Sequence, residues 1–206
     1  MENLPGVGEP AYWEAAYARG ADRWELGEPA PPLVALLNDH PPPPGRVAVL
    51  GCGRGHDARL LARRGCEVWG FDFAEPAIRE ARELARHDDP APRFEQRDLF
   101  TLPEAYPAFF DGIWEYTCFC AIDPARRAEY VECVRKILRP RGWFLALFYP
   151  LDAQLLGPPF PVSQDEVHHL FDPFFEFEAS AIPDTSIPRR LGKEWLVRAT
   201  LKPRID

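Results

Sequence analysis

Short runs of β-branched, aromatic and other apolar residues alternate with helical patterns along most of the chain. These runs predict strands near residues 46–51, 67–72, 94–98, 111–117, 142–149, 174–181 and 194–202. Such alternation is typical of βαβ units that build a mostly parallel sheet. The last two runs are separated only by IPDTSIPRRLGKE, a segment of loop-forming residues. We therefore expect an α/β fold in which the last two strands form an antiparallel pair at one edge.

One helix is clearly marked in the segment DPARRAEYVECVRKILRP. Its apolar stripe has helical spacing and consists of Tyr130, Val131, Val134, Ile137 and Leu138. Asp123-Pro124 is a typical helix opening, and Pro140 cannot continue a helix. We expect this helix to lie on the sheet with its stripe facing inward.

The stretch PPPPG at residues 41–45 is a stiff spacer between two parts of the chain. It separates an N-terminal arm, residues 1–40, from a core, residues 46–206. A chain of 206 residues is the right size for one domain. We expect residues 1–206 to form a single domain in which the arm serves as a lid.

Composition limits the partners that the chain can have. Its net charge of -8 repels nucleic acid. The five cysteines form no CxxC pair and show no zinc spacing, which fits reduced thiols in the cytoplasm and no metal. The N-terminus does not resemble a signal peptide, and the longest apolar run, WFLALFYP, is too short to span a membrane. We expect a cytoplasmic monomer that binds neither nucleic acid nor membrane and acts on a small molecule.

Three glycines follow the first predicted strand directly. Gly51, Gly53 and Gly55 come after RVAVL and precede a helix that begins near Asp57. Glycines there let the backbone turn sharply and approach a ligand at the carboxyl end of the sheet. Asp72 ends the next strand, where a carboxylate can accept hydrogen bonds from both ribose hydroxyls. The glycine turn and Asp72 together predict an adenosine site, with Phe73 beside Asp72 as a further contact.

The spacing of the glycines bears on which adenosine compound binds. Dinucleotide sites use G-x-G-x-x-G, and here His56 occupies the place of the third glycine. The pattern favours S-adenosylmethionine over NAD. An NAD-dependent oxidoreductase and a non-catalytic module that binds S-adenosylmethionine remain the alternatives. Asp98, after the third strand, can accept from the adenine amino group while the amide of Leu99 or Phe100 contacts a ring nitrogen; Asp98 can equally cap a turn.

Several motifs together resemble one family. They are YWEAAYARGADRWELGEPAPPL, LGCGRGHD, EYTCFCAIDPARRAEYV, LFYP, GPPFPVS and RLGKEWL. The chain resembles class I S-adenosylmethionine-dependent methyltransferases, specifically the thiopurine S-methyltransferase superfamily and its thiol and halide ("harmless to ozone layer"-like) branch. The resemblance implies a Rossmann-like, seven-stranded, mostly parallel sheet with an antiparallel last strand and an N-terminal helical arm.

The resemblance also implies roles for aromatic residues. Trp13, Tyr17 and Trp24 match arm residues that close over the cofactor, although the family would have a tryptophan in place of Tyr17. Their rings would attract the positive sulfonium by cation–π interaction. The alternative is that the three rings form a helix stripe packed on the core. Tyr116 resembles a tyrosine of the family that contacts the cofactor.

The cofactor's amino group has no obvious partner, because Val49 stands where many methyltransferases carry an acid. Asp57 and Glu115 are the candidates, and Asp57 is equally a candidate helix N-cap. Cys118 and Cys120 fit small buried apolar residues better than nucleophiles. The adjacent His168 and His169 point to different sides of a helix and make a poor metal chelate. We therefore assign neither a metal nor a catalytic residue.

The expected reaction is methyl transfer by in-line displacement to a small soft nucleophile: a thiol, hydrosulfide, thiocyanate or a halide. EYTC lacks the motif that orients amine acceptors, and a soft anion needs no general base. The pocket must strip water from the acceptor and align it. Candidate walls are Trp13, Tyr17, Phe119 and Phe160, with Arg189 or Arg190 as an anion guide. Thiopurine and metalloid acceptors are the alternatives within the superfamily.

Overall fold

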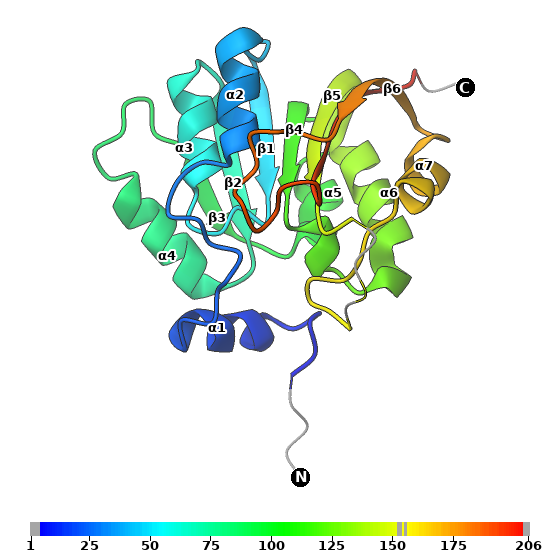
Figure 1. Cartoon of the computed structure of the whole chain (residues 1–206). Coiled ribbons are helices and arrows are strands. Elements are labelled where there is room, and N and C mark those ends of the chain that lie inside the picture. The colour runs from blue at the N-terminus through cyan, green and yellow to red at the C-terminus, as the bar shows by residue number, and fades with distance from the viewer. Residues whose placement is uncertain (1–4, 152–153, 155, 204–206) are drawn as a thin grey trace.

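The computed structural model describes residues 5–151, 154 and 156–203. Within these residues, seven strands form one sheet in the order β3-β2-β1-β4-β5-β7-β6 (Figure 1). The strands are β1 (Arg46–Leu50), β2 (Glu67–Asp72), β3 (Arg93–Gln96), β4 (Phe110–Tyr116), β5 (Leu138–Phe148), β6 (Phe175–Ala181) and β7 (Trp195–Leu201). β1 to β5 are parallel, whereas β7 is antiparallel to both β5 and β6. The predicted sheet with its antiparallel last strand is confirmed.

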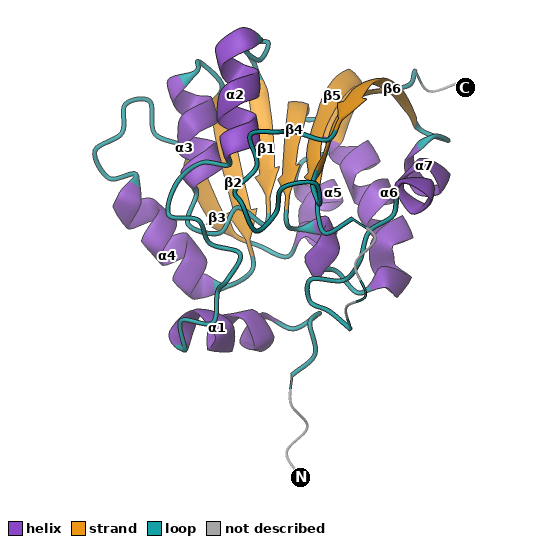
Figure 2. Ribbon diagram, in the orientation of Figure 1, coloured by secondary structure: helices purple, strands orange, loops and turns teal. Residues whose placement is uncertain are grey.

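Helices cover both faces of the sheet (Figure 2). Along β1, Val47 and Val49 belong to one apolar cluster while Ala48 and Leu50 belong to the other, as the two-residue period of a strand requires. One face carries α2 (Pro31–Asp39), α3 (His56–Arg63) and α4 (Glu75–Leu84), and the other carries α5 (Leu102–Ala105), α6 (Arg127–Ile137) and α7 (Gln164–Phe171). Because both faces are buried, the central strands are continuous apolar runs.

β5 begins earlier than the sequence pattern predicts. It starts at Leu138 rather than at residue 142, because Leu138 pairs with Phe110 before the ladder shifts register and Gly112 pairs with Trp143. The predicted helix consequently ends at Ile137 instead of reaching Pro140. Its start is also altered, because residues 124–126 form a 3₁₀ turn and α6 begins at Arg127.

The two edge strands of the sheet are β3 and β6, and both carry polar residues. β3 is also shorter than predicted. β3 ends at Gln96 because Asp98 turns the chain into a 3₁₀ turn, Leu99–Thr101. At the opposite edge, β6 carries the exposed residues Glu176 and Glu178 and shifts register between Phe177 and Ala179. The open sheet therefore has one short edge strand and one charged, irregular edge strand.

The expected arm, residues 1–40, divides into two parts. α1 (Pro10–Ala18) packs beside α4 and lies across the end of the sheet to which β1 to β4 point (Figure 1). α2 is different, because Leu33 and Leu37 are buried in the same cluster as Val47. The boundary at residue 40 is therefore corrected: the part of the arm outside the core ends before α2, and α2 belongs to the core.

The contact between Gly112 and Trp143 provides a test of the β4–β5 register. A Cβ on Gly112 would lie 1.9 Å from the Trp143 ring. We expect Gly112→Ala to lower the free energy of unfolding by about 1 to 3 kcal/mol, because the ring must move from a packed position. Urea unfolding measures this change. Gly8→Ala is the control, since nothing lies within 4 Å of its added Cβ. Equal stability of the two variants would contradict the register.

Candidate active site

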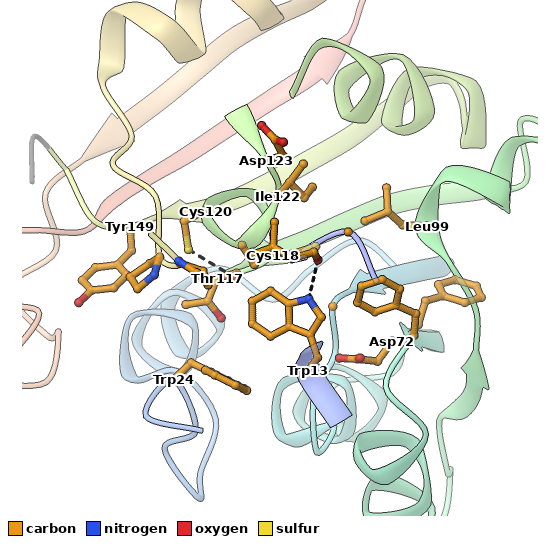
Figure 3. Close-up of a pocket in the computed structure, with 18 of the residues that line it drawn as sticks. Trp13, Trp24, Asp72, Leu99, Thr117, Cys118, Cys120, Ile122, Asp123 and Tyr149 are labelled. Carbon is orange, nitrogen blue, oxygen red and sulfur yellow. Dashed lines mark hydrogen bonds between the residues drawn. The ribbon is translucent and has the colours of Figure 1, made fainter. Parts of the chain in front are cut away.

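A cavity of about 580 Å³ lies at the carboxyl ends of the parallel strands. Its wall includes Gly51 after β1, Asp72 at the end of β2, Asp98 after β3 and Thr117 after β4. Open α/β sheets bind their ligands at this end. The arm closes the cavity from the other side through residues that include Trp13, Tyr17 and Trp24. In Figure 3, Trp13 lies between Asp72 on one side and Trp24 and Tyr149 on the other.

Two glycines of the turn after β1, Gly51 and Gly55, leave no room for a side chain. Gly51 has φ 58°, and a Cβ there would lie 2.9 Å from Cβ of Cys118. Gly55 has φ 76°, and its Cβ would lie 2.4 Å from the Phe94 ring. Both conformations and both contacts require glycine. Gly53 lies at a smaller neighbouring cavity of about 60 Å³, which shares Gly51, Trp24 and Thr117 with the larger one.

The carboxylate of Asp72 connects two backbone segments at the cavity. Oδ2 accepts from the N–H of Gly53 at 3.0 Å, and Oδ1 accepts from the N–H of Ala74 at 2.9 Å. Burial raises the pKa of Asp72 to about 6, against the lowering effect of these hydrogen bonds. A carboxylate has about four acceptor positions, so further donors can be accepted. Phe73 lines the cavity beside it.

Asp98 and Leu99 also line the cavity. The side chain of Asp98 accepts from the N–H of Phe100 at 3.0 Å and so caps the turn Leu99–Thr101. The capping role considered from the sequence is present. It leaves the second carboxylate oxygen available to a ligand, so capping and adenine contact are compatible.

The three aromatic residues of the arm form one cluster over the cavity. The Trp24 ring makes edge-on contacts with Trp13 at 5.4 Å and with Tyr17 at 5.5 Å between centroids. Trp13 Nε1 donates to the Val7 carbonyl at 2.8 Å. The cluster packs on Ala74 and Ala77 and is separate from the two main apolar clusters. The rings therefore do not form a stripe in the main core.

Four predicted site residues lie outside the described wall of the large cavity: Gly53 and Tyr116, which line the smaller cavity, and Phe119 and Phe160. Tyr116 donates its hydroxyl to Glu194 Oε1 at 2.7 Å. Phe119 turns into the core, where it contacts Tyr130 and Phe148, because residues 119–121 form a 3₁₀ turn. The N–H of Phe160 donates to the Cys120 carbonyl, and Pro158 and Pro159 line the cavity in its place. The prediction that Phe119 and Phe160 form walls of the pocket is therefore corrected.

Asp57 and Glu115, the two candidates for holding the cofactor's amino group, lie in different surroundings. Glu115 is buried and accepts from the N–H groups of Cys118 and Phe119 and from the Tyr130 hydroxyl, and burial raises its pKa to about 7. It faces neither cavity. Asp57 lies at the smaller cavity, where it accepts from the N–H of Ala30 and from Trp114 Nε1, both at 2.7 Å.

Of the two alternatives for Asp57, the role of helix N-cap is wrong. Gly55 is the N-cap of α3, and Asp57 lies in the first turn of that helix. Its two hydrogen bonds leave the helix and join the start of α2 to β4.

Other cavity residues were not singled out from the sequence. Thr117, Ile122 and Tyr149 line it, and Tyr149 follows the carboxyl end of β5, the signal that could have identified it. Cys118 and Cys120, for which the sequence favours buried apolar roles, also line it. Burial raises the pKa of Cys120 to about 12 and that of Cys118 well above its usual value, so both thiols stay protonated and are poor nucleophiles.

Two further features concern metals and membranes. Within residues 5–151, 154 and 156–203, no three His, Cys, Asp or Glu side chains are grouped so as to hold a metal ion. Over the same residues, no helix is long and apolar enough to cross a bilayer.

This fold and cavity define a class. The structure is similar to that of Burkholderia thailandensis 1,6-didemethyltoxoflavin-N1-methyltransferase, solved with 1,6-didemethyltoxoflavin and S-adenosylhomocysteine. The TM-score is 0.75 at 23% identity, over 99% of this chain and 93% of the other. The chain thus has the Rossmann-like fold of class I S-adenosylmethionine-dependent methyltransferases.

The sequence comparisons narrow the class to a family. The family model for thiopurine S-methyltransferase matches residues 8–201. A probable thiol methyltransferase 2 of Arabidopsis thaliana is 34% identical over 90% of this chain and 83% of its own length. Thiocyanate methyltransferase 1 of Brassica oleracea is 33% identical over 95% and 87%. The chain belongs to the thiopurine S-methyltransferase family and is an S-adenosylmethionine-dependent methyltransferase. The predicted family and cofactor are confirmed, and the comparisons do not favour the NAD-dependent alternative.

The pKa of Asp72 leads to a test of its contact with the ribose. The ionised carboxylate is the form that accepts from hydroxyls, and below about pH 6 this carboxyl is protonated. Affinity for S-adenosylhomocysteine should therefore rise as the pH increases through 6, by up to about tenfold per unit on the acid side. We expect Asp72→Asn to bind more weakly and to lose this dependence. Calorimetric titration between about pH 5 and about pH 8 measures both effects. An unchanged pH profile in the variant would exclude the assignment.

Proposed function

We propose that the cavity holds S-adenosylmethionine through residues from the strand ends, namely Gly51, Gly53, Asp72, Phe73, Asp98 and Leu99, and through the arm residues Trp13, Tyr17 and Trp24. The chemistry of the donors supports this assignment. Asp72 and Asp98 retain acceptor capacity for hydroxyl and amino groups, and the aromatic cluster suits a cation. Of the two acids considered for the amino group, we favour Asp57, because it lies at the adjoining small cavity.

The methyl acceptor that we propose is a small soft nucleophile: a thiol, hydrosulfide, thiocyanate or a halide. One observation carries this proposal: among the residues that the structure describes, no free base lines the end of the cavity that lies away from Asp72 and Asp98. There the lining consists of Tyr149, Pro158, Pro159, protonated thiols and two arginines. The third carboxylate of the described lining, Asp123, is exposed to solvent and caps a turn through the N–H of Ala125, so it is not a base enclosed with the acceptor. The names of the plant relatives point to the same acceptor class.

The residues of the chain then have three tasks in an in-line displacement. S-adenosylmethionine supplies a methyl group on a positively charged sulfur. The π faces of the arm residues stabilise positive charge by about 0.5 to 2 kcal/mol each, depending on their exposure to water. The apolar wall and the closed arm remove water from the acceptor, which strengthens a soft anion as a nucleophile. Arg189 and Arg190 add positive potential at the acceptor end.

We also propose that the chain works as a single domain and as a cytoplasmic monomer without a nucleic-acid partner. The net charge of -8 supports the last point, because it opposes binding to polyanions. Residues before Ala30 would serve as the lid, since their contacts with the rest of the molecule are a small apolar cluster and polar bonds.

An acceptor panel tests the proposed reaction. We expect S-adenosylhomocysteine formation with hydrosulfide, thiocyanate, iodide and a small thiol, at a kcat/KM at least about tenfold above that for 6-mercaptopurine, arsenite or an amine. A preference for 6-mercaptopurine or arsenite would assign the alternative acceptors of the superfamily. Binding of S-adenosylmethionine without turnover of any acceptor would indicate a non-catalytic module.

The lid is tested at Trp24. We expect Trp24→Ala to lower kcat/KM about 10- to 100-fold while the melting midpoint changes little, because the ring covers the cavity and lies outside the main core. Trp24→Phe keeps an aromatic face and should recover most of the activity. Turnover assays and circular dichroism melts measure the two effects. A collapsed melt, or full activity of the alanine variant, would contradict the lid.

A further inference from the structure

Two adjacent arginines hold two adjacent carbonyls of the arm. Arg189 Nη2 donates to the carbonyl of Arg23 at 2.9 Å, and Arg190 Nη2 donates to the carbonyl of Trp24 at 3.0 Å. The arginines belong to the loop between β6 and β7, at the other end of the chain from the arm. All four residues line the large cavity. The arm and this loop therefore meet at the acceptor end of the site.

Arg190 is the buried member of the pair. Arg190 is 2% exposed. Its guanidinium lies 4.8 Å from the centroid of the Tyr149 ring and 5.1 Å from that of the Tyr116 ring. Nη1 donates to the Tyr116 hydroxyl and lies 3.6 Å from Glu194 Oε1. Glu194 is completely buried. A buried guanidinium with these partners has one orientation, and that orientation directs Nη2 at the arm.

The buried ion pair is poorly explained by stability alone. Oε2 of Glu194 has no hydrogen-bond partner among the described residues, and an unsatisfied buried carboxylate oxygen is costly. Apolar residues of similar volume would often be as stable as a buried pair. The pair instead joins three separate segments: the arm at Trp24, the end of β4 at Tyr116 and the β6–β7 loop.

The opposite side of the same arm segment is tied to the glycine turn. Arg54 contacts Asp22 and lies 3.3 Å from Glu25, and His56 also lies 3.3 Å from Glu25. Against the effect of burial, the bonds from His56 and from the N–H of Gly27 lower the pKa of Glu25 to about 2, so this carboxylate is ionised. Residues 22–25 are thus held through side chains on the cofactor side and through backbone carbonyls on the acceptor side.

We propose that Arg190 is a positioning residue that latches the lid, with Glu194 and Tyr116 fixing its orientation, rather than the residue that contacts an acceptor anion. Its bond to the Trp24 carbonyl keeps the Trp24 ring against Trp13 and Tyr17. The inference rests on the proposed lid. It holds for any acceptor, because closure of the arm precedes the choice of nucleophile.

Trypsin tests the latch without any acceptor. The Arg23–Trp24 peptide bond lies between the two latched carbonyls, so its initial cleavage rate, followed by mass spectrometry, measures opening of this segment. We expect Arg190→Met to raise that rate at least about tenfold, the effect of losing one charge-assisted hydrogen bond. Arg127→Met is the matched control: Arg127 is equally buried and pairs with Glu166 at 2.6 Å, but it touches neither the arm nor the cavity. Equal rates in wild type and Arg190→Met would overturn the latch.

Two further variants separate a latch from a loss of stability or of charge. The double variant Arg190→Met/Glu194→Met leaves no unpaired buried charge, so it should fold and still be cleaved rapidly. Arg190→Lys keeps the positive charge but loses the planar fork, and it should also be cleaved rapidly. In both variants kcat/KM should fall by the same factor for thiocyanate, iodide and a small thiol. A loss confined to thiocyanate, restored by lysine and without faster cleavage, would assign Arg190 to the anion and refute the latch.

Failure of the proposed acceptors can be distinguished from failure of the latch, because an inactive acceptor panel says nothing about cleavage by trypsin. It would leave the cleavage rates as described and would disprove the proposed acceptors alone.

Discussion

The carboxylate of Asp72 is the interaction around which the site is built. It accepts from Gly53 in the turn after β1 and from Ala74 at the start of α4, so one side chain fixes the relative positions of two strand ends. That fixed geometry needs glycine at residue 51, where Cys118 leaves no room for a Cβ. The cavity wall therefore depends on one half-buried acid that both organises the backbone and lines the cavity.

The arm is attached by a different kind of force. The main sheet is held by two large apolar clusters, whereas the arm before α2 contributes a small cluster on Ala74 and Ala77 and several polar bonds. Apolar burial scales with area and is lost only when large surfaces separate, while a few hydrogen bonds and ion pairs can open locally. This difference in attachment is the physical basis of the proposed lid, because the arm can separate from the cavity without loss of the two large clusters.

The sequence predicts the seven strands and the end of the sheet at which the cavity lies, because strand runs, the glycine turn and Asp72 are local patterns. The start of β5 was missed, since its first residues, LRPRG, continue a helical stripe and contain a proline. Phe119 was misplaced because a 3₁₀ turn redirects it into the core. The contacts of Arg190 with Trp24 and Glu194 join distant segments, and no local pattern in a single sequence reveals such contacts.

The edges of the sheet bear on how the molecules behave when they are crowded together. An open sheet exposes unpaired backbone groups on its outer strands, and these groups can recruit strands from other chains. Here one outer strand, β3, has four residues, and the other, β6, carries Glu176 and Glu178 and an irregular register. Short length, like charges and a bulge each oppose the addition of a further strand. Both edges of the sheet can therefore remain unpaired without serving as a template for aggregation.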